Sequence, residues 1–332
     1  MKIVRTDAEL QVLDLDDRLR ADGHEVVLLS DGVSEDELIE ALRNADILMM
    51  CYTPVTAHVL ENAPNLCGIL KYGVGIDAID IPAAKAQGVT VVNIPEYAES
   101  TVAEGAFLLA LALLKKLPAL SKEMNKKGWA WPEKTWLGRD VAGLTFGIVG
   151  LGRIGQSFAR MAGAGFGADV IAYDPLQLDT TFAKAGVERV ASLEVLLDRA
   201  DVVSLHTILN DETRNMIGGP EMARMKPTAL LINVSRGGLV DEEALISALD
   251  QGQIAGAGLD VYSREPIDRN HPLHGRPNVI LLPHLTFWTE DALKRLEDDC
   301  YARLQEMIEG RPVEIRSKDP RLQGQANAIY PE

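Results

Sequence analysis

The sequence has few cysteines, few basic side chains relative to acidic ones, and no long apolar run. Its 3 cysteines in 332 residues are odd in number and form no CxxC pair, so neither a disulfide framework nor a thiolate metal site is indicated. The formal net charge is −16, from 33 Lys and Arg against 49 Asp and Glu, which disfavours nucleic acid and anionic membranes as partners. The longest apolar run, residues 106–114, is far shorter than the roughly 18 residues of a membrane span. With no signal-peptide core at its start, we expect a protein of the reducing cytoplasm that does not enter a membrane.

The length and the order of β-rich and helical segments predict two domains. At roughly 100 to 200 residues per domain, the chain is long enough for two cores with a cleft between them. Short β-rich runs alternate with helical stretches, which predicts parallel sheets. The expected strands are residues 26–29, 47–50, 68–71 and 89–92, and then residues 144–149, 169–173, 202–205, 229–234, 255–261 and 279–282. The predicted fold class is α/β, with two Rossmann-like doubly wound parallel-sheet domains and a cleft between them.

Three further segments have distinct compositions. Residues 101–117 are apolar and rich in helix formers, and Pro118 is expected to end or bend that helix, which we expect to bridge the two domains. Residues 126–139 hold three of the four tryptophans among Gly and Pro, which is typical of a packed loop or a subunit contact. The chain is expected to be helical from 289 to 308 and to end in a polar tail, residues 316–332, with little to bury.

A glycine-rich segment, Gly150-Leu151-Gly152-Arg153-Ile154-Gly155, directly follows an expected strand and opens a helical run. This is the context that a dinucleotide fingerprint requires, since glycines permit a tight turn and a close approach of the backbone to a pyrophosphate at a helix N-terminus. Asp174 ends the next strand, 19 residues after Gly155, near the ~20 expected for an acid that binds ribose hydroxyls. Asp174-Pro175 could instead only start a turn. We predict a site for NAD, because an acid there repels the 2′-phosphate of NADP.

Three ionisable residues follow the later expected strands, namely Arg236, Glu265 and His284. Carboxyl ends of parallel strands are where open α/β sheets bind ligands. His284 is the candidate acid/base for a carbonyl that accepts a hydride, with Glu265 favouring the imidazolium and Arg236 holding a carboxylate or polarising the carbonyl. Each of them, taken singly, could be an ordinary loop residue. His271 and His274 flank a proline without a carboxylate or thiolate cluster, so we predict no metal site.

With these motifs, nearly the whole chain resembles the D-isomer-specific 2-hydroxyacid dehydrogenase family. The resemblance lies in residues 63–80 with Lys71-Tyr72-Gly73-Val74-Gly75, in Thr101-Val102-Ala103-Glu104, in the glycine segment, and in residues 233–241, 258–262, Glu265-Pro266 and Pro283-His284. It implies an NAD-dependent enzyme that transfers hydride between NADH and the C2 carbonyl of a 2-oxo acid, with Arg236, Glu265 and His284 as the catalytic residues. It also implies a homodimer, built largely on the cofactor domain.

The resemblance further implies a domain organisation and a set of contacts. A discontinuous substrate-binding (catalytic) domain, residues 1–99 plus 286–332, would flank an NAD-binding Rossmann domain, residues 100–285. The main chain at Val74 and Gly75 would bind the substrate carboxylate beside Arg236. The implied cofactor contacts are Gly150, Gly152, Arg153, Ile154, Gly155, Asp174, Thr207, Val234 and Asp260, with Asp260 orienting the nicotinamide amide, and with Thr101 and Thr213 as further contacts.

The chain departs from the family pattern at two places. Ile208 stands where proline is common, and Phe287 and Trp288 stand where many members have small residues, which is more similar to the D-lactate dehydrogenase branch. We hypothesise that Tyr52, Tyr72, Phe287 or Trp288 lines or narrows the substrate pocket, with core packing as the alternative for Phe287. Two other functions stay open: a non-enzymatic, NAD-sensing module like the corepressors of this fold, and a formate-type dehydrogenase. Glu265 argues against the second, whose family has Gln there.

Overall fold

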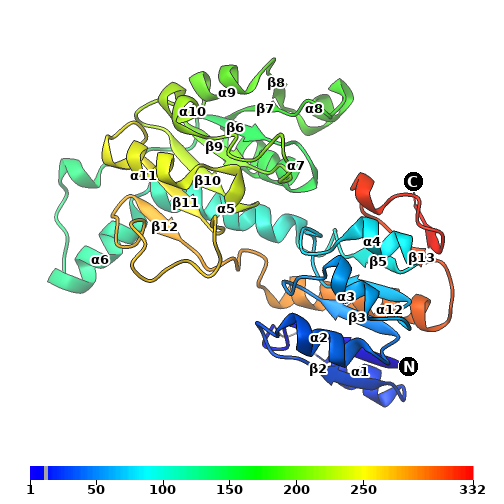
Figure 1. The fold of residues 1–332 in the computed structure, drawn as a ribbon. Helices are drawn as coiled ribbons and strands as arrows, with labels where there is room; N and C mark the ends of the chain where they lie inside the picture. Colours follow the sequence, from blue (N-terminus) through cyan, green and yellow to red (C-terminus); the bar gives the residue numbers. More distant parts are fainter. Residues whose placement is uncertain (11–13, 332) are drawn as a thin grey trace. The chain divides into compact units, whose positions relative to one another are not determined.

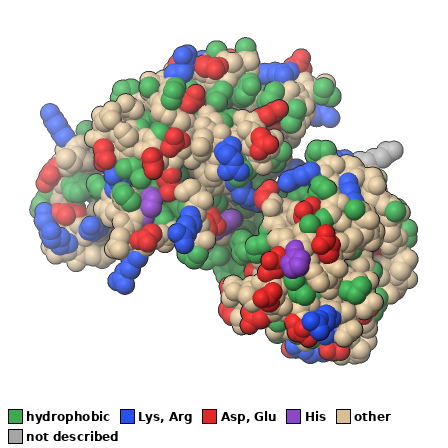
Figure 2. All heavy atoms as spheres, in the orientation of Figure 1, with side chains coloured by type: hydrophobic (Ala, Val, Ile, Leu, Met, Phe, Trp, Pro, Cys, Tyr) green, Lys and Arg blue, Asp and Glu red, His purple; other side chains and the backbone are tan. Residues whose placement is uncertain are grey.

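The computed structural model describes residues 1–10 and 14–331, and the chain divides into two compact units (Figure 1). The first unit is Met1–Ala98 with Trp288–Glu332, and the second is Glu99–Phe287. Each unit has a parallel β-sheet with helices, so the predicted class of two doubly wound α/β domains is confirmed. Acidic and basic side chains are interspersed on the visible face of the molecule (Figure 2). No helix in the described part of the chain is both long and apolar enough to cross a membrane.

The first unit contains a five-stranded parallel sheet with the order β2-β1-β3-β4-β5. The strands are β1 (Lys2–Arg5), β2 (Glu25–Leu28), β3 (Ile47–Met50), β4 (Gly68–Lys71) and β5 (Thr90–Asn93). The helices are α1 (Leu15–Ala21), α2 (Glu35–Leu42), α3 (Ala57–Glu61), α4 (Ile81–Ala86) and α12 (Glu290–Ile308). The pattern did not predict β1, because its two apolar residues lie between Lys2 and Arg5. The strand order reverses between β1 and β3, the kind of place where such sheets bind ligands.

The polar end of the chain packs on the first unit. It forms a short parallel pair, β13 (Val313–Glu314) with β14 (Ala328–Ile329), and a 3₁₀ turn, η4 (Pro320–Leu322). The Gln325 amide accepts from the N–H of Val91 at 2.6 Å and donates to its carbonyl at 2.9 Å, so it continues the pairing of edge strand β5. Leu322 is fully buried. The tail thus buries Ser317, Leu322 and Gln325, while its other described residues are half-buried or exposed, as its polar composition predicted. Residue 332 lies outside the described residues.

The second unit contains a seven-stranded parallel sheet with the order β12-β11-β10-β9-β6-β7-β8. The strands are β6 (Thr145–Val149), β7 (Asp169–Tyr173), β8 (Glu188–Arg189), β9 (Val202–Leu205), β10 (Leu230–Asn233), β11 (Gly256–Leu259) and β12 (Val279–Leu281). Six of them lie where the pattern predicted strands. The pattern missed β8, a two-residue polar edge strand that only its pairing with β7 defines. The order reverses between β6 and β9.

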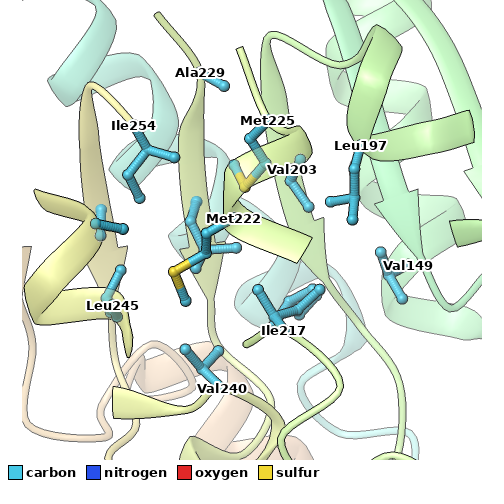
Figure 3. Close-up of a cluster of buried hydrophobic side chains, with 14 of the residues drawn as sticks. Val149, Leu197, Val203, Ile217, Met222, Met225, Ala229, Val240, Leu245 and Ile254 are labelled. Atoms are coloured by element: carbon cyan, nitrogen blue, oxygen red, sulfur yellow. The ribbon is translucent and has the colours of Figure 1, made fainter. Parts of the chain in front are cut away.

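Successive residues of a strand point to opposite faces of the sheet. Both faces of this sheet carry apolar side chains, and helices cover both. In β9, Val202 packs with one apolar cluster and Val203 with the other. Figure 3 shows the second of these clusters, with Leu197, Met222 and Leu245 around the strands. The helices of the unit are α5 (Glu99–Leu114), α6 (Leu117–Lys127), α7 (Arg153–Arg160), α8 (Asp179–Ala185), α9 (Leu193–Arg199), α10 (Gly219–Arg224) and α11 (Glu242–Asp250), with the short turns η1 (Lys134–Trp136), η2 (Met161–Gly165) and η3 (Gly237–Leu239).

The apolar helix predicted for residues 101–117 is shorter than expected and is followed by a second helix. Helix α5 ends at Leu114, Lys116 adopts a left-handed conformation with φ 56°, and Pro118 lies in the first turn of α6, where its missing N–H costs nothing. Pro118 thus starts a helix instead of bending one. Helix α6 buries none of its residues in the second unit, and it extends away from that unit's sheet in Figure 1.

Candidate active site

The glycine segment forms the turn between β6 and α7 in the second unit. Gly150 has φ +93°, and a Cβ there would lie 2.7 Å from the carbonyl carbon of His206, so this position requires glycine. A Cβ at Gly155 would lie 2.2 Å from the Gly150 oxygen. Glycine at this position therefore lets the start of α7 pack closely against the turn that follows β6. At Gly152, by contrast, a Cβ would meet nothing within 4 Å. Two glycines therefore make the turn, and the third leaves open space at the N-terminus of α7.

Asp174 lies at the end of β7, next to this turn. Its carboxylate accepts from the N–H of Leu151 at 2.8 Å and from the N–H of Leu176 at 2.9 Å. The residue thus both starts the expected turn and touches the glycine segment. A cavity of about 460 Å³ adjoins it, lined by Tyr173, Asp174, Pro175, Arg189, Val190 and Ala191. An open glycine turn, a carboxylate and a cavity beside it fit the pyrophosphate and adenosine of a dinucleotide.

Arg236 follows β10, and two residues that the sequence analysis did not single out hold its backbone. The Asn233 side chain accepts from the N–H of Ser235 at 3.0 Å and donates to the Arg236 carbonyl at 2.9 Å. A Cβ on Gly237 would lie 1.9 Å from the backbone of Tyr262, so only glycine fits there. The segment of Arg236 therefore packs directly against the chain that follows β11. An asparagine and a glycine have no reactive side chain, so nothing in the sequence marked these two residues as part of the site.

Glu265 and His284 form a hydrogen-bonded pair. The Oε2 atom of Glu265 lies 2.7 Å from Nδ1 of His284, and Oε1 accepts from the N–H of Tyr262 at 3.0 Å. Burial raises the pKa of the Glu265 carboxyl, but the hydrogen bond and charge of His284, the Tyr262 N–H and the charge of Arg236 outweigh burial and hold that pKa below its ordinary value. Glu265 is therefore an anion at neutral pH. With Nδ1 engaged, Nε2 is the ring atom that His284 can offer to a substrate.

The backbone of His284 is held in a left-handed conformation, φ 59°, by anchors on both sides. On one side the Tyr262 hydroxyl donates to the Leu282 carbonyl at 2.7 Å. On the other, the fully buried Asp260 carboxylate accepts from the N–H groups of Leu285 and Thr286 at 2.8 and 3.0 Å and from the Thr286 hydroxyl at 2.6 Å. In this structure Asp260 thus fixes the loop after His284. Its expected contact with the nicotinamide amide stays a prediction.

The other expected cofactor residues of the second unit occupy varied positions. Arg153 forms an ion pair with Glu99 at 2.9 Å, and Thr213 donates to the Ile208 carbonyl at 2.7 Å within its own loop. Thr101 and Val234 are buried, whereas Ile154 and Thr207 are half-buried. His206, below the glycine turn, bonds through Nε2 to the Ser204 hydroxyl at 2.8 Å, and burial lowers its pKa to about 3. A ring that stays neutral at this depth cannot act as the acid that His284 is expected to be.

The substrate residues expected from the resemblance lie in the first unit. Val74 and Tyr52 are exposed beyond the carboxyl ends of β4 and β3, and Gly75 is half-buried. Tyr72 is only 1% exposed, and its hydroxyl donates to the Thr6 and Asp7 carbonyls at 2.5 and 3.1 Å. The hypothesis that Tyr72 lines a pocket is therefore wrong, because the chain directly after β4 turns this ring into the core.

The aromatic pair after the His284 loop is split between the two units. Phe287, the last residue of the second unit, is buried, while Trp288, the first residue of the returning segment, is partly exposed. The core packing considered for Phe287 is what the structure has. His271 bonds to Glu242 at 2.9 Å, and no group of three or more His, Cys, Asp or Glu suited to a metal occurs among the residues described.

A doubly wound sheet with this glycine turn, Asp174 and the Glu265–His284 pair defines an NAD-dependent oxidoreductase. Residues 107–286 match the family model described as "D-isomer specific 2-hydroxyacid dehydrogenase, NAD binding domain". The chain is 41% identical, over 80% of its length and 80% of the relative, to a glyoxylate reductase of Korarchaeum cryptofilum. The chain belongs to the D-isomer-specific 2-hydroxyacid dehydrogenase family, and its cofactor is NAD(H).

Two further similar proteins are named for other substrates. A D-3-phosphoglycerate dehydrogenase of Methanocaldococcus jannaschii is 38% identical over 87% of this chain but only 54% of that relative, so the chain spans about half of its length. The crystal structure of a D-lactate dehydrogenase from Aquifex aeolicus, complexed with NAD and lactic acid, has a TM-score of 0.83 at 28% identity and covers 93% of this chain and 96% of that one. These relatives have different substrates, so the family is assigned but the substrate is not.

Proposed function

We propose that this protein reduces a small 2-oxo acid to the D-2-hydroxy acid with NADH. The observation that carries the proposal is the Glu265–His284 pair, with Nδ1 and Oε2 2.7 Å apart and the charge of Arg236 acting on the same carboxylate. An imidazole oriented by an anion is a general acid for an oxygen that becomes an alkoxide, and a guanidinium is a partner for a carboxylate. The glyoxylate reductase among the relatives supports a small substrate.

In the proposed reaction each residue has one task. Reduced nicotinamide, when bound, supplies the hydride to C2 of the substrate. Nε2 of His284 gives its proton to the C2 oxygen, because Glu265 engages Nδ1 and stabilises the imidazolium. Arg236 binds the substrate carboxylate, and the N–H groups of Val74 and Gly75 are proposed as further donors to it on the strength of the family resemblance.

We propose that residues beside the glycine turn hold the cofactor and select NAD over NADP. The open space at Gly152 accepts the pyrophosphate next to the backbone at Arg153 and Ile154. The Asp174 carboxylate binds the adenosine ribose, and its negative charge repels a 2′-phosphate. Asp260 keeps the loop of His284 in place, as its three hydrogen bonds to residues 285 and 286 support.

We also propose that the protein is a homodimer that uses α6 and the tryptophan-rich segment after it. Helix α6 has no buried residue, and Trp129, Trp131 and Leu137 are 58%, 74% and 71% exposed. Apolar side chains gathered on an extension of one domain are typical of a protein interface. Analytical ultracentrifugation of Trp131→Ser against the unsubstituted chain tests this: a dimer that weakens supports it, and a monomer in both cases contradicts it.

The activity is tested by steady-state kinetics with pyruvate, glyoxylate, hydroxypyruvate and phenylpyruvate, each with NADH and NADPH. We expect turnover of at least one small substrate with NADH, and its loss in His284→Ala, whose NADH affinity is retained. Near-normal kcat/KM in His284→Ala would show that another group donates the proton. NADH binding without turnover of any 2-oxo acid would instead favour a cofactor-sensing module, and formate-dependent formation of NADH would favour the formate-type reaction.

A further inference from the structure

A lysine and a cysteine lie together in the first unit, whereas Glu265 and His284 belong to the second. Lys71 ends β4 and Cys51 follows β3, two neighbouring strands in which Met50 is paired with Lys71. The Lys71 ammonium donates to Sγ of Cys51 at 2.9 Å. Both residues are only 6% exposed. The contact is therefore a feature of the interior and not a chance meeting of two surface side chains.

The charge of Lys71 is what makes this contact unusual. A buried ammonium normally needs an anionic partner, because removal from water costs several kcal/mol. No carboxylate of the described chain lies within ion-pair distance of Nζ; its neighbours include the Cys51 sulfur and the ring of Tyr52, whose centroid is 5.4 Å away, and its charge also acts on the thiol of Cys300. The Cys51 sulfur, which as a thiol donates to the Tyr72 carbonyl at 3.5 Å, can carry the balancing negative charge when it loses that proton. An adjacent ammonium favours the thiolate, which is the nucleophilic form of cysteine.

The other two cysteines have surroundings that favour the protonated thiol. Burial and the charge of Asp299 raise the pKa of the Cys300 thiol well above its ordinary value, and they outweigh the opposite effect of the Lys71 charge. Burial, with the charge of Asp46, also raises the pKa of Cys67. The raised pKa favours the protonated, less nucleophilic form of both thiols near neutral pH. Cys51 is the cysteine of this chain that hydrogen-bonds a cationic side chain.

We propose that Cys51 and Lys71 form a covalent modification site, at which a peroxide oxidises the sulfur and the lysine amine closes an S–N cross-link. The thiolate attacks one oxygen of hydrogen peroxide; the O–O bond breaks, the sulfur becomes a sulfenic acid and hydroxide leaves. The hydroxide takes a proton from the Lys71 ammonium. The neutral amine then attacks the sulfenic sulfur, the S–N bond forms, and the S–O oxygen leaves as water. The sulfur is oxidised by two electrons, the peroxide is reduced to two waters, and the protein loses two hydrogens.

The site lies directly below the segment expected to bind substrate. A Cβ on Gly73 would be 2.8 Å from Nζ of Lys71 and 3.9 Å from Sγ of Cys51, so the cross-link would form against the backbone of Gly73. Val74 and Gly75 follow immediately. An effect of the cross-link on the enzyme would rest on the proposed function of these two residues. The formation of the cross-link does not, and it can be measured without any assay of turnover.

The test treats the reduced full-length chain with hydrogen peroxide and follows it by mass spectrometry. We expect an intact mass lower by two hydrogens. Trypsin should no longer cleave after Lys71, because that amine is blocked, so the peptide that starts at residue 44 should extend to Lys85 with its Cys51 unavailable to alkylation. A thiol reductant should restore both the mass and the cleavage. Oxygen added to the protein with normal cleavage after Lys71 would overturn the proposal.

Single substitutions identify the two atoms that are joined. Cys51→Ser should abolish the cross-link, and Lys71→Arg should stop at a sulfenic acid that dimedone traps, because a guanidinium keeps the charge but is a poor nucleophile. Cys67→Ser, the matched control, should behave like the unsubstituted chain. A product that persists in Cys51→Ser, or disappears in Cys300→Ser as a disulfide would, contradicts the proposal. A cross-linked chain that never reduces a 2-oxo acid would refute only the proposed function.

Discussion

Replacing Glu265 with glutamine tests how much of the proposed catalysis depends on its charge. The substitution keeps the shape of the side chain and one oxygen, which can still accept from the Tyr262 N–H now at 3.0 Å from Oε1. It removes the anion that lies 2.7 Å from Nδ1 of His284. We therefore expect the fold to persist while the imidazolium loses its stabilising partner.

The magnitude follows from the strength and exposure of this hydrogen bond. A hydrogen bond to a charged group contributes about 1.5–3 kcal/mol. The side chains of His284 and Glu265 are 25% and 34% exposed, so solvent screening places the loss at the lower end of that range. At about 1.4 kcal/mol per factor of ten, we expect roughly a tenfold fall in kcat/KM at neutral pH.

The pH dependence gives the sign of the effect. The partners of Glu265 hold the pKa of its carboxyl below the ordinary value, so the unsubstituted enzyme keeps this anion well into the acidic range. The contribution of the anion to kcat/KM is therefore present above the ordinary carboxyl pKa and is lost as the pH falls through the lowered one. Glu265→Gln has no carboxylate at this position, so its pH profile should lack that fall in acid.

The assay is kcat/KM for the best 2-oxo acid with NADH across the pH range, for Glu265→Gln, His284→Ala and the double variant. Because Glu265 is proposed to act through His284, the double variant should be no slower than His284→Ala alone. Independent, additive losses, or a pH profile of Glu265→Gln that keeps the fall in acid, would refute the reasoning. Unfolding curves measured in parallel separate an effect on stability from an effect on catalysis.

The remaining predictions concern the cofactor site and the stability of the second unit. Gly152→Ala should fold normally but bind NADH at least tenfold more weakly by fluorescence titration, since its Cβ would occupy open space, whereas Gly155→Ala should unfold at lower temperature because its Cβ would lie 2.2 Å from a backbone oxygen. Asp174→Ala should lower the preference for NADH over NADPH; unchanged discrimination in kcat/KM would reject its role. Asp201 accepts from Arg139, Lys226 and the Thr145 N–H; burial raises its pKa, but these partners outweigh burial and lower it. Its contribution is present above the ordinary carboxyl pKa and is lost as the pH falls through the lowered one, so Asp201→Asn should cost about 1–2 kcal/mol in urea unfolding at pH 7 and progressively less in acid. A cost independent of pH would contradict this assignment.

The local pattern predicted most strands of the second unit, because strands that are buried on both faces have continuous apolar sequences between turns. The pattern missed β1, β8 and the short pair of β13 with β14. Lys2 and Arg5 flank only two apolar residues, and Glu188–Arg189 has no apolar residue at all. Such short strands form because a neighbouring strand supplies the hydrogen bonds, which is not visible in the segment itself.

The candidate site also has one part that the sequence predicted and another that depends on the fold. The spacing of the glycines and of Asp174 predicted a dinucleotide site because the turn, the helix start and the acid are local features joined by one strand. The 2.7 Å contact of Glu265 with His284 was expected from chemistry, but its geometry depends on Asp260 and Tyr262, which anchor the chain on both sides of His284. Those anchors join residues 20 to 26 positions apart, and only folding brings them together.

Sequence alone thus determined the class of fold and the cofactor, since each depends on short-range order along the chain. It also supplied the proposal that a histidine is the acid and a glutamate its partner. The tertiary structure decided which aromatic rings lie in the core, as Tyr72 does. It also shows that only glycine fits at position 237, where a Cβ would clash with the backbone of Tyr262. It also brought Lys71 against Cys51 across two strands. These features depend on strand register and on close packing between distant segments, and a one-residue change in register would reverse the direction of every side chain in the strand.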